Sequence, residues 1–209
     1  MSACVACAGG VETLGICQLH EVCAAVIPVF NESNVLPPFS GGSPALPTEL
    51  SPYTANMCEV IARFGSTPER KAILIGLLSY RQALRAQGLI EGFQWIDGSF
   101  VENVEVSRGR PPADVDLVTF VRRPAGLKDG VQWAGFVKAT PELFSPRETK
   151  RRYLCDAYLG DLDGRGEMLV EDTKYWFGLF SHQRDTSLWK GMLKVPLCSD
   201  DDRARELLL

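Results

Sequence analysis

The sequence predicts an α+β fold in which a small mixed β-sheet is flanked by helices. Two observations lead to this prediction. One long segment, 67–87, has apolar residues at three- and four-residue spacing, which is the period of an amphipathic helix. Several shorter segments are rich in β-branched and aromatic residues and end at glycine or aspartate turns, which is typical of strands.

The helix has a recognisable start and end. Thr67 is expected to cap it, Pro68 suits its first turn, and Gly88 supplies the stop. The expected strands are 92–97, 115–121, 135–139, 153–159 and 189–195. A second helix is expected over 173–180.

Composition divides the 209 residues into three zones. Residues 1–27 are rich in cysteine and glycine, and residues 28–52 hold six of the 13 prolines. Because proline fixes φ and lacks an amide donor, 28–52 is expected to be an extended arm lying against the main body. The main domain is expected over 53–209.

Charge and hydropathy exclude several classes of function. The formal net charge of −4 argues against broad DNA binding, which usually requires a basic excess. No apolar run reaches the roughly 18 residues needed to span a membrane, and the N-terminus does not read as a signal peptide. Seven cysteines, an odd number without the spacing of a secreted disulfide framework, favour a reducing cytoplasm.

The first zone predicts a structural zinc site of the zinc-ribbon type. Two-residue spacing separates Cys4 from Cys7, and Cys17 from His20, with Cys23 three residues further on. Four of these five soft ligands could bind Zn²⁺ tetrahedrally, with the choice between His20 and Cys23 left open. Packing of reduced thiols is the alternative.

Three carboxylates carry the predicted chemistry. Asp114 and Asp116 are two residues apart beside a strand, so their side chains point to one face. Like charges held so close require either that one carboxylate is protonated or that a cation lies between them, and hard oxygen ligands suit Mg²⁺. Asp156 lies alone in an apolar strand, and the same metal site is its expected partner.

Gly98 and Ser99 follow the strand that precedes these acids. A glycine there lets phosphate oxygens approach the backbone amides, and the serine hydroxyl adds a donor. A phosphate-binding bend beside a metal-binding carboxylate pair is typical of active sites that catalyse phosphoryl or nucleotidyl transfer. Each part alone is commonly a turn or a structural acid. The same holds for Lys150, expected at a solvated edge, and for His182, expected in an exposed loop.

Together, Gly98-Ser99, Asp114-x-Asp116 and Asp156 resemble the minimal nucleotidyltransferases of the DNA polymerase β-like superfamily. Segments 93–102, 112–118 and 176–191 are similar to a family of small bacterial nucleotidyltransferase-like proteins. The resemblance covers about residues 28–197. It implies two Mg²⁺ or Mn²⁺ ions bound by the three aspartates, and a nucleoside triphosphate held by Gly98 and Ser99.

The resemblance also implies the reaction, which is transfer of a nucleoside monophosphate to a protein, an RNA or a small molecule. A toxin–antitoxin or anti-phage defence role is implied by resemblance alone. The sequence departs from the minimal members in one respect. They usually carry a small residue and an arginine shortly after Gly-Ser, whereas Phe100, Val101 and Glu102 follow here. Arg108, Arg110 or Lys190 are therefore the candidates for contacting the triphosphate. The alternative is a catalytically inert partner or antitoxin protein that binds protein or RNA.

Overall fold

The computed structural model describes residues 27–41, 43–47 and 49–208. The predicted zinc ligands Cys4, Cys7, Cys17, His20 and Cys23 lie outside the described residues. The zinc-ribbon-like module therefore stays a prediction.

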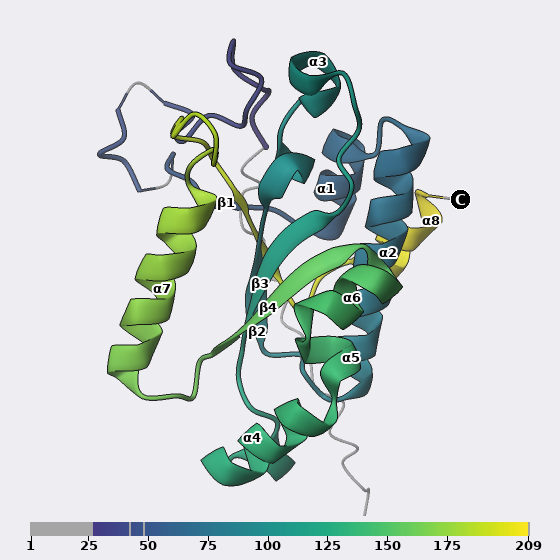
Figure 1. The fold of residues 1–209 in the computed structure, drawn as a ribbon, viewed down its shortest axis with the longest axis vertical. Coiled ribbons are helices and arrows are strands. Elements are labelled where there is room, and N and C mark those ends of the chain that lie inside the picture. The colour runs from purple at the N-terminus through teal and green to yellow at the C-terminus, as the bar shows by residue number, and fades with distance from the viewer. Residues whose placement is uncertain (1–26, 42, 48, 209) are drawn as a thin grey trace, which may run out of the picture.

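A five-stranded sheet with the order β1-β5-β2-β3-β4 forms the centre of the structure (Figure 1). Its strands are β1 (Tyr53–Thr54), β2 (Gly92–Asp97), β3 (Val115–Val121), β4 (Cys155–Asp161) and β5 (Leu193–Pro196). The β1–β5 and β3–β4 pairs are parallel, and β2 runs antiparallel to both of its neighbours. The predicted mixed sheet and the α+β class are confirmed.

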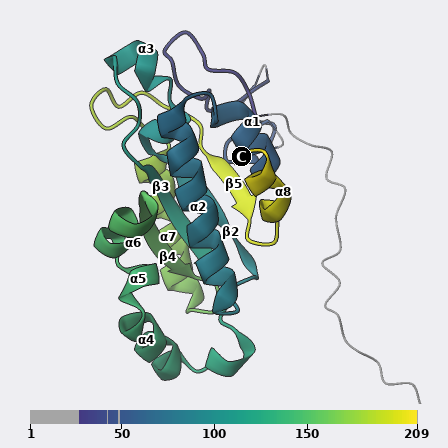
Figure 2. The same ribbon diagram turned by 90° about the vertical axis from the view of Figure 1, so that its right-hand side faces the viewer.

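Helices cover both faces of this sheet. The long helix α2 crosses one face (Figure 2), and α7 covers the other. The helices are α1 (Met57–Phe64), α2 (Pro68–Ala86), α3 (Val104–Arg108), α4 (Gly130–Ala139), α5 (Pro141–Phe144), α6 (Pro146–Tyr153), α7 (Gly166–Phe180) and α8 (Asp201–Glu206), with 3₁₀ turns η1 (Gly98–Val101) and η2 (Ala125–Leu127).

Each sheet face has its own core because alternate strand residues point to opposite sides. Ile96, Leu117 and Ala157 belong to the larger core, which includes α1, α2 and α8. Trp95 and Val118 belong to the smaller core, which includes Trp176 and Phe180 of α7. A strand side chain therefore lies on the same face as any of these residues that is an even number of positions away on its own strand.

The helix predicted over 67–87 forms as α2. Thr67 caps it by accepting a hydrogen bond from the Arg70 amide, and Pro68 occupies its first turn. Ile73, Leu74 and Leu77 are buried on its sheet-facing side. The apolar stripe that predicted this helix is thus the stripe that packs on the sheet.

The prediction of a strand at 135–139 is wrong, because these residues end helix α4. The Asp129 carboxylate caps α4 by accepting from two amides of its first turn. Trp133, Phe136 and Val137 then meet the core at three- and four-residue spacing. The helical period and the cap outweigh the strand preference of the short apolar run.

Two other strands and one helix are displaced from their predicted bounds. Residue 153 ends α6 and Leu154 takes a left-handed conformation, so β4 begins at Cys155 rather than at 153. The last strand is shorter than expected and begins at Leu193. Helix α7 begins at Gly166, before the expected residue 173.

The proline-rich arm lies against the main domain. Val35 and Leu36 are fully buried. The Leu36 carbonyl accepts from the Gly191 amide, and the Tyr53 hydroxyl donates to the Pro37 carbonyl. In the described part of the chain, no helix is both long enough and apolar enough to cross a lipid bilayer.

Candidate functional site

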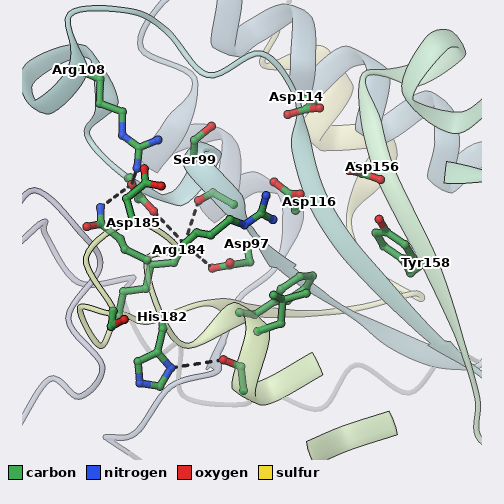
Figure 3. A pocket seen from close by; sticks show the side chains of 18 of the residues that line it. Asp97, Ser99, Arg108, Asp114, Asp116, Asp156, Tyr158, His182, Arg184 and Asp185 are labelled. Atoms are coloured by element: carbon green, nitrogen blue, oxygen red, sulfur yellow. Dashed lines mark hydrogen bonds and ion pairs between the residues drawn. The ribbon is translucent and has the colours of Figure 1, made fainter. Parts of the chain in front are cut away.

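Strand register brings three aspartates together at one end of the sheet. Asp97 of β2 is directly opposite Asp116 of β3, and Asp116 is directly opposite Asp156 of β4. Each of these aspartates is two residues along its strand from a residue of the smaller core: Trp95, Val118 or Tyr158. All three therefore point to the face covered by α7. Figure 3 shows Asp114, Asp116 and Asp156 along this end of the strands.

The Gly98-Ser99 bend lies beside Asp116. Gly98 has φ of +79°, and a Cβ atom added there would lie 1.8 Å from Asp116 Oδ2. Only glycine fits both the left-handed backbone and the close approach of the carboxylate. The bend therefore lies on the same side of the sheet as the aspartates, as the nucleotidyl-transfer hypothesis requires.

These residues line an open cleft of about 530 Å³. Its floor comes from the ends of β2, β3 and β4, and its rim comes from the α3–β3 and α7–β5 connections. Members that bear on the chemistry are Asp97, Gly98, Ser99, Glu102, Arg108, Arg110, Asp114, Asp116, Lys150, Asp156, His182, Arg184 and Lys190. The cleft thus collects the five predicted site residues of the main domain.

Lys190 is buried and paired beside the Gly98-Ser99 bend, so it is not a free cation in the cleft. Its side chain is only 2% exposed, and its ammonium is 3.0 Å from Asp97 Oδ1 and 3.0 Å from Glu102 Oε1. The same ammonium donates to the Gly98 carbonyl at 3.1 Å. One buried cation therefore binds a carboxylate before the bend, a carboxylate after it and the Gly98 carbonyl of the bend itself.

Burial and like charges perturb two aspartates of the floor. Burial raises the pKa of Asp97 to about 7, although Lys190 opposes this rise. Burial, followed by the charges of Asp114 and Asp156, raises the pKa of Asp116 to about 6. A carboxylate whose charged form is disfavoured by neighbouring carboxylates is a site where a cation would bind favourably.

Lys150 of α6 contacts two other carboxylates of the cleft. Its ammonium forms an ion pair with Asp114 and lies 3.9 Å from Asp156 Oδ2. Hydrogen bonding to Asp114 raises the pKa of Lys150, and the charges of Asp156 and Asp116 add to this. The residue expected at a solvated edge therefore supplies the cation between two predicted metal ligands.

The donor set of Asp114, Asp116 and Asp156 fits Mg²⁺ because it offers hard carboxylate oxygens on one open cleft. Within 27–41, 43–47 and 49–208, no three acidic, histidine or cysteine side chains stand close enough to hold one ion as they are placed. Metal binding by these three carboxylates would therefore require their side chains to rearrange.

The remaining candidates fall into two groups. Arg110 and Arg184 are exposed on the cleft, and Figure 3 shows Arg184 reaching over it from the α7–β5 connection. Arg108 lies 3.4 Å from Glu102 Oε2, so it has a carboxylate partner. His182 is exposed, as expected, and its Nδ1 is 2.9 Å from the Ser181 hydroxyl.

Sequence reasoning missed the roles of Asp97 and Lys150. Asp97 had a detectable signal, because it ends a strand two residues after Trp95 and directly precedes Gly98. Lys150 had none, since its contact with Asp114 spans 36 positions and depends on how α6 packs on the sheet.

The fold and cleft define a mixed α+β protein with a carboxylate-lined cleft at one end of its sheet. The chain belongs to the Family of unknown function (DUF6932), whose model matches residues 28–196. No curated protein and no solved structure matches the chain.

Proposed function

We propose that this protein is a Mg²⁺-dependent nucleotidyltransferase that uses a nucleoside triphosphate. The single observation that carries the proposal is the convergence of Asp114, Asp116 and Asp156 beside the Gly98-Ser99 bend on one open cleft. Three strands contribute to this arrangement, so it is not a by-product of local sequence.

One set of residues would bind the triphosphate and another would bind the metal. The Ser99 hydroxyl and the backbone amides of the bend would donate to the triphosphate, while Arg110 and Arg184 would face it from the rim. Asp114, Asp116 and Asp156 would hold Mg²⁺, which neutralises phosphate charge and lowers the pKa of an acceptor hydroxyl.

In the proposed step, an acceptor hydroxyl attacks the α-phosphorus. A bond forms between the acceptor oxygen and phosphorus, and the bond to the β-phosphate oxygen breaks. The hydroxyl proton passes to Asp156, and pyrophosphate leaves. The acceptor class remains a protein side chain, an RNA end or a small molecule, in a cytoplasmic setting that includes toxin–antitoxin or anti-phage defence.

The test is transfer of label from each α-labelled nucleoside triphosphate to a cell extract with Mg²⁺. We expect Asp114→Asn and Asp116→Asn to reduce transfer at least 100-fold, in line with losses on removing preorganised charge. Asp172→Asn, which removes one α7 carboxylate outside the cleft, is the matched control. Equal transfer by wild type and both cleft variants would refute the proposal.

A second candidate, a catalytically inert partner or antitoxin protein, is favoured by one observation. Lys150 already supplies a cation to Asp114 and Asp156, as a structural ion-pair network would. Calorimetry separates the two candidates. The inert partner predicts no Mg²⁺-dependent affinity for a triphosphate, whereas the transferase predicts affinity that disappears in Asp116→Asn.

A further inference from the structure

Lys150 occupies the position where a cation would contact two of the three predicted metal ligands. Its ammonium pairs with Asp114 and is 3.9 Å from Asp156 Oδ2. A lysine ammonium is charged at neutral pH. The carboxylates and the lysine therefore form a partly neutralised cluster without any metal.

The two lysines of the cleft differ in their freedom to leave it. The Lys190 side chain is 2% exposed and is bound on several sides. The Lys150 side chain is 54% exposed, whereas the Asp114 side chain that it contacts is only 12% exposed. A long, solvated lysine stem on a helix end can swing outward at little cost, while the aspartates are held by the sheet.

A single ammonium leaves the cluster incompletely neutralised. Lys150 pairs with Asp114 and lies near Asp156, whereas no ion pair among the described residues includes Asp116. A divalent cation would supply twice the charge at the same carboxylates. The ammonium and the metal would need the same oxygen atoms, so they cannot both bind them fully.

From this geometry we propose that Lys150 is an internal competitor for Mg²⁺ that regulates the cleft. Lys150 pairs with Asp114 when Mg²⁺ is scarce and is displaced into solvent when Mg²⁺ binds. It thereby sets the Mg²⁺ concentration at which the cleft becomes competent. The inference rests on the metal site of the proposed function, although it does not require the transfer reaction.

The expected size of the effect follows from linkage. A site that is competent only part of the time binds with its intrinsic affinity reduced by the competent fraction. If Lys150 covers the ligands about nine-tenths of the time, its removal tightens the apparent Mg²⁺ affinity about tenfold.

The experiment is a calorimetric titration of the purified protein with Mg²⁺ alone. We expect Lys150→Met to tighten the Mg²⁺ dissociation constant about tenfold. Arg151→Met is the matched control because it removes one positive charge from the next residue, which pairs with Glu148 instead. This control is expected to stay within about twofold of wild type, since an exposed charge outside the cluster is screened.

A second measurement uses the wild-type protein and needs no variant. Acylation of Lys150 by an amine-reactive ester, followed by peptide mapping, should become faster when Mg²⁺ is added. Lys138, on a different helix and outside the cleft, is the internal reference and should react at an unchanged rate.

Each outcome decides the inference. Equal or weaker Mg²⁺ binding by Lys150→Met, with wild type binding Mg²⁺, overturns the inference and leaves the proposed function intact. Tighter binding by this variant without any nucleotidyl transfer supports the inference and refutes the proposed function. Absence of Mg²⁺ binding in both proteins refutes both.

Discussion

Two regions of this protein bury charge, and they do so in opposite ways. Around Arg81, each charged group is matched. Its guanidinium bonds both oxygens of Asp201 and the Gln94 side-chain carbonyl, with Arg81 and Asp201 side chains 1% and 2% exposed. Arg85 adds a second cation to Asp201. This network joins α2, the sheet and α8.

The cleft at the end of the sheet brings like charges together instead. Burial, followed by the charges of Asp114 and Asp156, raises the pKa of Asp116 to about 6. The ion pairs of the described residues include none to Asp116. Buried charge by itself therefore says little about function, whereas unmatched charge on an open cleft marks a candidate binding site.

The largest effect expected from this contrast is at Arg81. Arg81→Met leaves the buried Gln94 carbonyl without its donor and removes the more buried of the two cations that pair with Asp201, so we expect the free energy of unfolding to fall by about 3–5 kcal/mol. Urea denaturation followed by circular dichroism measures the change. Arg122→Met is the control: it removes the half-exposed arginine that pairs with Asp163, so it should lower the free energy of unfolding by less than about 1 kcal/mol. Similar losses in both variants would contradict the assignment of the Arg81 network as structural.

A smaller effect is expected at the bend. Gly98→Ala adds a Cβ at positive φ against Asp116, so it should cost more than the roughly 1–2 kcal/mol of left-handed strain and should displace the carboxylate. Gly109→Ala is the matched control, because Gly109 also has positive φ but no atom lies within 4 Å of its added Cβ. Denaturation and Mg²⁺ titration of both variants separate strain from the clash. Equal behaviour would remove the special role of the Gly98–Asp116 contact.

The smallest effect, with the opposite sign, is expected at Asp116. Asp116→Asn removes one member of a like-charged group, so the protein without divalent cations should keep its stability or gain up to about 1 kcal/mol. Thermal unfolding in a chelator measures this. A loss of several kcal/mol would mean that the Asp116 carboxylate is structural, and the contrast between the two regions would fail.

How much of the fold was predictable depends on how local its signals are. The strands Gly92–Asp97 and Val115–Val121 were predicted with their observed bounds, because each is an apolar run between turn residues. Helix α4 was missed because its short apolar segment reads equally well as a strand. Its cap and its packing against the core decided the outcome.

The candidate site was predictable to the same extent. Spacing alone places Asp114 and Asp116 on one face, since strand geometry alternates side chains. The sequence therefore determined the class of fold, the pair of carboxylates on one face and the position of the Gly98-Ser99 bend. Tertiary structure decided that Asp156 aligns with Asp116, that Lys190 is locked behind the bend, and that Lys150 contacts Asp114. These depend on strand order and helix packing, which bring together residues dozens of positions apart and leave no trace in local sequence.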